Sequence, residues 1–163
     1  MAGGNFTAFN GTDANRLVRL NANGSVDTAF VTALGSGADD LVATLYVQGD
    51  GKILVGGRFS TLAGVARPRV ARLDSTGALD SNFDASISPT YSGTFPNYCN
   101  HILMQPDTRI LIALDEFSSG QTGLKRVFSA QSAPTGIVEF GGGSVTVNEG
   151  QTATLAVSRR GGS

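Results

Sequence analysis

The feature that most constrains this chain is an internal repeat. Residues 4–30 align without gaps over residues 57–83, so that Gly4 falls on Gly57 and Phe30 on Phe83. Nine of the 27 aligned positions are identical, and most of the others keep their chemical class. In the first copy the identical positions are Gly4, Phe6, Gly11, Arg16, Arg19, Leu20, Gly24, Asp27 and Phe30. Such a repeat indicates an array of similar units that bury their apolar faces against one another.

A second overlap extends the repeat toward the C-terminus. Residues 47–55, VQGDGKILV, align over residues 104–112, MQPDTRILI, so that Val47 falls on Met104. The spacing is slightly longer than in the first overlap, and the extra length falls in a segment rich in Pro, Ser, Thr and Tyr around residues 86–97. We therefore expect about two and a half units over residues 1–133, with the third copy decaying after Leu114.

Each unit is expected to form three or four short antiparallel strands. Residues 40–48 alternate loosely, Gly49-Asp50-Gly51 is a strong hairpin signal, and residues 52–59 form the return strand. Residues 69–74 and 79–83 complete the unit, and the Gly56-Gly57 pair predicts a bulge or a close backbone approach. No helical period is sustained, and 22 glycines with only 15% charged residues suit tight turns. The predicted fold class is all-β, with antiparallel propeller-blade-like repeats.

Residues 51–83, GKILVGGRFSTLAGVARPRVARLDSTGALDSNF, resemble the delta-60 repeat family. The resemblance covers about residues 2–114 and implies β-propeller blades of a bacterial extracellular or surface protein. The chain begins in the middle of a unit, so the first blade is expected to lack its inner strand. Because propellers close with about four to eight blades, the ring is expected to be incomplete. Self-association through open sheet edges is therefore a further hypothesis.

Residues 134–163 are expected to form a second module. The steps Ile-Val-Glu-Phe, Val-x-Val-x-Glu-Gly, Thr-x-Leu-x-Val and Arg-Arg-Gly-Gly follow in order over about residues 137–163. They resemble the start of a Calx-beta domain, which implies the first strands of a β-sandwich. The resemblance places the first-strand calcium ligand of such domains near Gly141. Glu139 and Glu149 are therefore interpreted as strand and turn acids.

Charge and composition exclude several classes of partner. A net charge of −1 offers no footprint for nucleic acid, and no apolar run is long enough to insert into a membrane. We interpret Arg67, Arg69 and Arg72 as a solvated strand face. A single cysteine excludes an internal disulfide and a thiolate zinc site. No signal peptide is visible, so an export signal is expected outside this chain.

Few residues are candidates for chemistry, and no catalytic motif is present. Asp39 and Asp40 precede the strand that would line a propeller axis, and Asn97 and Asn100 take comparable places in the next unit. Oxygen ligands converging there could hold Ca²⁺, with His101 and Asp40 as weak catalytic candidates. The alternative to this functional interpretation is that these are ordinary turn residues.

Two pairs of residues also carry both a structural and a functional interpretation. Cys99 and His101 are two apart, and hence share one face of a regular strand. A strand face is favoured over a nucleophile pair. Asp27 and Asp80 recur with the repeat, which favours turn acids that accept backbone N–H groups.

Two hypotheses of function follow. The leading one is a scaffold or adhesive binding module of a secreted or surface bacterial repeat protein, with a protein, carbohydrate or small molecule as its ligand. The alternative is a small Ca²⁺-dependent hydrolase acting on a lactone or ester.

Overall fold

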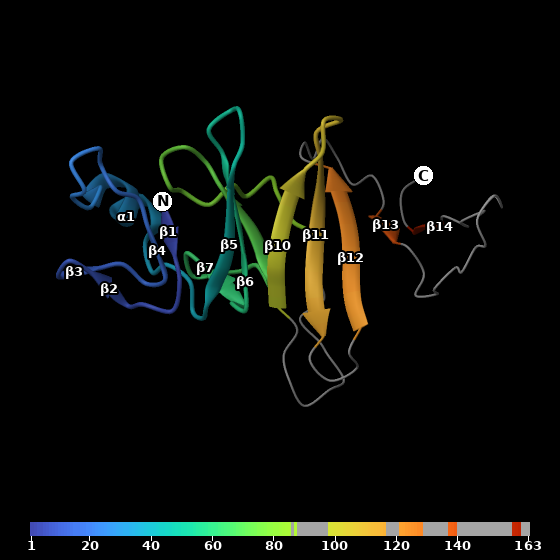
Figure 1. Cartoon of the computed structure of the whole chain (residues 1–163), viewed down its shortest axis with the longest axis horizontal. Coiled ribbons are helices and arrows are strands. Elements are labelled where there is room, and N and C mark those ends of the chain that lie inside the picture. Colours follow the sequence, from blue (N-terminus) through green and yellow to red (C-terminus); the bar gives the residue numbers. More distant parts are fainter. Residues whose placement is uncertain (86, 88–97, 117–120, 129–136, 140–157, 161–163) are drawn as a thin grey trace, which may run out of the picture.

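The computed structural model describes residues 1–85, 87, 98–116, 121–128, 137–139 and 158–160. Small antiparallel sheets follow one another along the length of the molecule (Figure 1). The strands of the first unit are β1 (Ala2–Gly3), β2 (Ala8–Phe9), β3 (Thr12–Asp13) and β4 (Leu17–Val18). Those of the second are β5 (Val42–Val47), β6 (Ile53–Gly57), β7 (Thr61–Leu62), β8 (Val65–Ala66) and β9 (Val70–Leu73). Then come β10 (Tyr98–Met104), β11 (Arg109–Glu116), β12 (Gln121–Phe128), β13 (Ile137–Glu139) and β14 (Ser158–Arg160).

The register of strand pairing repeats with the sequence. Each pair that joins β1 to β4 recurs between β6 and β9, at the positions that the repeat alignment makes equivalent. The β2–β3 hairpin and the isolated bridge that closes the unit recur in the same way. Matching pairs are Ala2↔Val18 with Val55↔Ala71, Phe9↔Thr12 with Leu62↔Val65, and Leu20↔Val26 with Leu73↔Leu79. The predicted equivalence of residues 4–30 and 57–83 is confirmed for their strand pairing.

The third unit continues beyond the part whose sequence matches the repeat. β10 pairs with β11 as β5 pairs with β6 in the preceding unit, and both pairs contain the same register shift near the start of the first strand. β12 then pairs along the whole of β11, which places Arg126 opposite Leu111 as Arg72 lies opposite Leu54. The repeat resemblance decays after Leu114, but the strand pairing continues through β12. Strand pairing uses backbone groups, so it persists where the side chains no longer match.

One helix departs from the all-β expectation. α1 (Thr28–Leu34) follows Asp27, whose side chain accepts a hydrogen bond from the Phe30 N–H at 3.1 Å. Gly35, with a φ of 66°, ends the helix. The helix has seven residues, of which Phe30 and Leu34 are buried, and this is too short for a helical period to appear in the sequence. Antiparallel sheets otherwise make up the described structure, as predicted.

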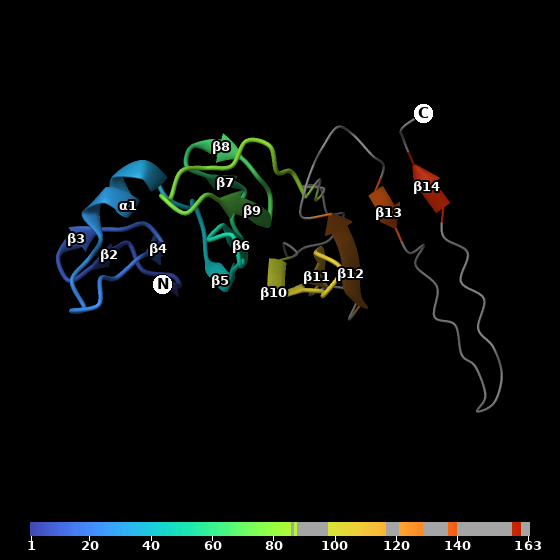
Figure 2. The ribbon, with the colours of Figure 1, turned by 90° about the horizontal axis from the view of Figure 1, so that it is seen from above.

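Two cores lie between successive units, and β6 contributes to both. Ile53 and Val55 face the core shared with the first unit, while Leu54 faces the core shared with the third. Seen from above, the sheets stand one after another in a row (Figure 2). The predicted close approach is confirmed at Gly56, where a Cβ would lie 2.6 Å from Cys99 Sγ. The bulge itself lies opposite, between Val42 and Thr44 of β5.

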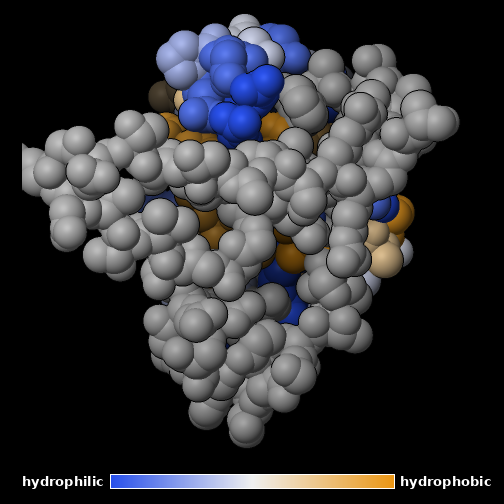
Figure 3. Space-filling model, turned by 90° about the vertical axis from the view of Figure 1, so that its right-hand side faces the viewer, coloured by the Kyte–Doolittle hydropathy of each residue, from blue (hydrophilic) through white to orange (hydrophobic). Residues whose placement is uncertain are grey.

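The two ends of the described repeat array differ from its centre. β1 pairs only with β4 among the described strands, whereas β6 lies between β5 and β9, so the first unit lacks an inner strand as expected. On the outer face of the third sheet, Leu103 and Leu124 are 58% and 55% exposed. Hydrophobic residues, coloured orange, are visible on this side of the molecule in Figure 3. The corresponding face of the second sheet is covered by β10 and β11.

The described part of the tail continues the third sheet. β13 pairs with β12 through Arg126↔Val138, and β14 pairs with β13. Residues 140–157, on which most of the Calx-beta resemblance depends, lie outside the described residues. The boundary between residues 133 and 134 stays a prediction.

Candidate functional site

Each of the first two units is closed by an arginine, an aspartate and a phenylalanine. These are Arg19, Asp27 and Phe30 in the first unit, and Arg72, Asp80 and Phe83 in the second. The arginine Nε donates to the aspartate Oδ2 at 2.8 Å in the first unit and 2.9 Å in the second. In both units the guanidinium carbon lies 4.6 Å from the centre of the phenylalanine ring, a cation–π geometry. The recurring arginine–aspartate and arginine–phenylalanine contacts therefore stabilise each of the two units.

The predicted structural role of the two recurring aspartates is confirmed. The other carboxylate oxygen of each accepts a backbone N–H, from Phe30 for Asp27 and from Asn82 for Asp80. The hydrogen bond from Phe30, followed by that from Arg19, lowers the pKa of Asp27. Burial opposes ionisation of Asp80, but the charge of Arg72 and the Asn82 N–H offset it and hold its pKa below the ordinary value.

The interpretation of Arg67, Arg69 and Arg72 as a solvated face was wrong. Arg69 and Arg72 are 5% and 3% exposed, and all four residues of β9 are buried. The strand has a packed unit on each side, so neither of its faces meets solvent. Arg69 donates to the carbonyl oxygens of Arg58 and Phe59, which satisfies its guanidinium within the protein. Burial lowers its pKa.

Asp39 and Asp40 directly precede β5, where the sequence placed them. Both carboxylates are engaged in contacts with neighbouring residues of the protein. One oxygen of Asp39 accepts the N–H groups of Ser60 and Thr61 at 2.8 and 3.0 Å. Asp40 forms a two-point ion pair with Arg58, at 3.0 and 3.2 Å, and also accepts the Leu41 N–H. Burial would raise the pKa of Asp40, but Arg58, the Leu41 N–H and the charge of Arg16 lower it.

The remaining calcium candidates are Asn97 and Asn100, of which only Asn100 is among the described residues. Asn97 lies outside them, and Asn100 is half-buried in β10. Within the part of the chain that the structure describes, no three His, Cys, Asp or Glu side chains are grouped to hold a metal ion. Calcium binding stays a prediction.

Cys99 and His101 do not share a face, contrary to the spacing argument. The register shift between them pairs Cys99 with Leu114 and His101 with Ala113. Cys99 is fully buried and His101 is exposed. Burial raises the pKa of the Cys99 thiol to about 12, so hardly any nucleophilic thiolate exists at neutral pH. The expectation that a strand face is favoured over a nucleophile pair holds for Cys99, which packs in the core.

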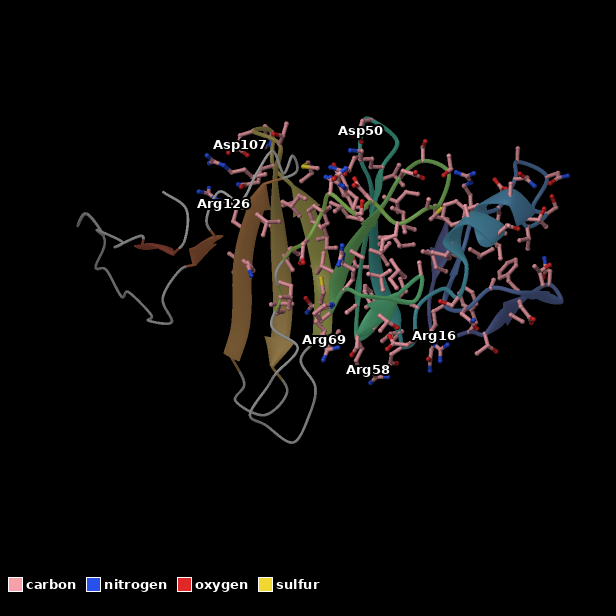
Figure 4. The ribbon with its side chains drawn as sticks, turned by 180° about the vertical axis from the view of Figure 1, so that it is seen from behind. Arg16, Asp50, Arg58, Arg69, Asp107 and Arg126 are labelled. Carbon is pink, nitrogen blue, oxygen red and sulfur yellow. The ribbon has the colours of Figure 1, made fainter. Side chains whose placement is uncertain are left out.

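Three arginines of the first two units lie at one end of the repeat array (Figure 4). Figure 4 shows Arg16, Arg58 and Arg69 at this end, with Asp50 and Asp107 on the hairpin tips at the opposite end. We call the set Arg16, Asp39, Asp40, Arg58 and Arg69 the arginine end. Arg16 and Arg58 are the members that sequence reasoning missed as candidates, although the recurrence of Arg16 as Arg69 was visible. The arrangement brings together three cations and two carboxylates from two units.

Comparison with known proteins agrees with this repeated architecture, which is that of a β-propeller-type domain. Residues 1–30 and 48–83 match a family model described as a β-propeller domain of unknown function, DUF5122. Residues 1–83 therefore carry a DUF5122 β-propeller domain, which confirms the propeller part of the sequence prediction. No curated protein and no solved structure matches the chain.

The comparisons give no support for a Calx-beta domain, which stays a prediction. Among the described residues, no helix is long and apolar enough to cross a membrane.

Proposed function

We propose that this chain is a scaffold or binding module of a secreted or surface bacterial repeat protein. The observation that carries the proposal is what the polar residues of the arginine end do. Asp39 fixes the loop at Ser60 and Thr61, and Asp40 holds Arg58. Side chains used in this way give a rigid surface built on paired strands, which suits recognition.

The location outside the cell is part of the same proposal. It is supported by the resemblance of residues 2–114 to delta-60 repeats and of residues 137–163 to the start of a Calx-beta domain. The proposed ligand is a protein, a carbohydrate or a small molecule.

The rival is the calcium-dependent hydrolase, and one assay separates the two. Hydrolysis of a nitrophenyl ester and of a simple lactone is measured with added Ca²⁺ and with EGTA. The same is done for Asp39→Ala/Asp40→Ala and, as a control, Asp50→Ala on the opposite hairpin tip. We expect no turnover above the buffer rate in any sample. Turnover that EGTA and the double substitution both abolish, and that Asp50→Ala leaves intact, would replace the binding module with the hydrolase.

A further inference from the structure

The outer face of the third sheet carries three leucines at the places where the second sheet has a packed apolar face. We call them the third-sheet patch: Leu103, Leu111 and Leu124. By strand register, their equivalents in the second sheet are Tyr46, Leu54 and Val70. The matching pairs are Leu103↔Leu111 with Tyr46↔Leu54, and Ala113↔Leu124 with Gly56↔Val70. The two sheets therefore present apolar side chains at the same places.

The two faces differ in what lies on them. Leu54 and Val70 are 0% and 1% exposed, because the third unit packs over them. Leu103 and Leu124, by contrast, are 58% and 55% exposed, and Leu111 is half-buried. Neighbouring exposed leucines of this kind mark an interaction surface. The second sheet shows what covers such a face, namely another unit of the same repeat.

The first unit carries the counterpart of this surface. Its half-buried apolar side chains form what we call the first-unit patch: Ala2, Phe6, Phe9 and Leu20. The ring centres of Phe6 and Phe9 lie 6.2 Å apart, in edge contact. The repeat equivalents of the four residues are Val55, Phe59, Leu62 and Leu73. All four equivalents are fully buried in the core where the second unit meets the first. The first-unit patch is therefore the kind of surface that packs against a preceding unit.

The two patches lie at opposite ends of the row of repeat sheets (Figure 2). Each has the character of the surface that the other packs against within the repeat. We propose that the third-sheet patch of one molecule packs on the first-unit patch of a second copy of this chain. The contact reproduces, between molecules, the way in which successive units pack within one molecule. This inference goes beyond the proposed binding function and does not depend on it.

The number of units sets the expected size of the assembly. Contacts between unlike faces produce either a closed ring or an open filament. Two copies of three units each fall within the range of about four to eight blades that close a propeller ring, and three copies exceed it. We therefore expect a closed dimer in which each copy uses both patches. Among the described strands the first unit lacks an inner one, so its contact area is small and the dimer should be weak.

The test is sedimentation velocity of the full chain at concentrations below and above ~10 μM, the dissociation constant expected for such a weak dimer. We expect a reversible shift with concentration from the 16.8 kDa chain to a species of twice that mass. The species should not grow further at the highest concentration, because both patches of each copy are then occupied.

One variant at each patch makes the result specific. Leu124→Lys places a positive charge on the third-sheet patch, and Phe9→Glu places a negative charge on the first-unit patch. Each should weaken dimerisation at least tenfold. Val65→Lys is the matched control, because Val65 is 42% exposed on β8 of the second unit, outside both patches. It should dimerise as the wild type does.

Folding of the first-unit variant needs its own check, because Phe9 also contacts Phe6. The circular dichroism spectrum and melting temperature of Phe9→Glu are compared with those of the wild type. Ala2→Glu, a second variant of the same patch, should weaken dimerisation in the same direction and takes the place of Phe9→Glu should that variant unfold.

A mixture of the two variants tests whether unlike faces meet. A mixed dimer regains one native contact, and at its other contact the lysine-bearing patch meets the glutamate-bearing patch. Equimolar Leu124→Lys and Phe9→Glu should therefore dimerise more tightly than either variant alone. Pairing of two third-sheet patches would instead leave Phe9→Glu dimeric by itself.

A wild type that stays monomeric at every concentration would overturn the inference, and something other than a second copy would then cover the patches. Equal association of wild type and Leu124→Lys, or a mixture no tighter than its components, would overturn it as well. Assemblies that lengthen steadily with concentration would contradict the closed dimer. The assay of ester and lactone turnover is unaffected by any of these results.

Discussion

The first and second units place the same closing motif in different surroundings. The pairs Arg19–Asp27 and Arg72–Asp80 have the same geometry, yet their side chains are 33% and 20% exposed in the first unit and 3% and 9% in the second. The second unit is packed between two others, and Lys52 adds a further contact to Asp80 at 3.4 Å. The shared residues therefore keep the geometry of the contact, while the neighbouring units determine how far it is buried.

The largest difference is expected when the motif arginine is removed. Arg72→Met should destabilise the protein by about 3 kcal/mol, because it leaves a buried carboxylate without its main partner. Lys52 remains near Asp80 and keeps the loss at the lower end of that class. Arg19→Met removes the same contacts from a more exposed site and should cost clearly less. Urea unfolding of both variants checks this, and equal losses would show that neighbouring units do not matter.

A matched pair of glycines tests the missing inner strand. A Cβ on Gly57 would lie 2.0 Å from the backbone oxygen of Leu41, whereas its nearest contact on Gly4 would be Phe6 Cδ1 at 3.1 Å. Leu41 directly precedes β5, the strand that has no counterpart in the first unit. Gly57→Ala should therefore cost about 1–3 kcal/mol, the usual range for overpacking, and Gly4→Ala less. A greater loss of melting temperature for Gly4→Ala would contradict the comparison.

The pH dependence of stability should reflect the titration of Asp80 in the buried Arg72–Asp80 pair. The pKa of Asp80 is lowered on folding, so its contribution is present above the unfolded pKa of about 4 and is lost as the pH falls through the lower folded value. The stability gap between wild type and Asp80→Asn should be wide at pH 7 and should narrow at pH 3. Asp27→Asn should give a smaller gap. Urea midpoints at the two pH values measure both, and a gap that widens in acid would refute this.

The smallest expected effect is on the reactivity of the Cys99 thiol, which lies in the core between the second and third units. Cys99 takes the place of Val42 in the repeat and lies against Gly56. With its pKa raised to about 12, it should not react with Ellman's reagent at pH 8 until the protein is unfolded. His101→Cys in a Cys99→Val background should react at once, because position 101 is exposed. Rapid labelling of native Cys99 would mean that the second and third units separate readily.

Much of the fold could be predicted because the chain contains an internal repeat, and its copies can be aligned with each other. The β5–β6 hairpin, the unit boundaries and the close approach at Gly56 all depend on local turn chemistry or on glycine, which sequence reports directly. The register shift that separates Cys99 from His101 could not be predicted, since one inserted residue reverses the face of those that follow. The burial of Arg69 and Arg72 depends on neighbouring sheets, which alternation along one strand does not reveal.

The sequence predicted where the candidate site lies, but not which contacts its side chains make. Asp39 and Asp40 lie at the end of the unit where the repeat placed them, but their oxygens accept hydrogen bonds from the adjoining loop and from Arg58. The distinct arrangement of Arg16 depends on which carbonyls its side chain reaches, and this differs from that of its repeat partner Arg69. Because both copies have arginine at this position, the sequence alone did not reveal the difference.

The central claim, that two stretches fold as equivalent stacked sheets, is tested most directly by cross-strand NMR contacts. The structure requires contacts between Ala2 and Val18 and also between their repeat equivalents, Val55 and Ala71. Nuclear Overhauser effects should link the backbone protons of both pairs with the same pattern. A one-residue slip in either pair, or the absence of one set in the folded protein, would contradict the account.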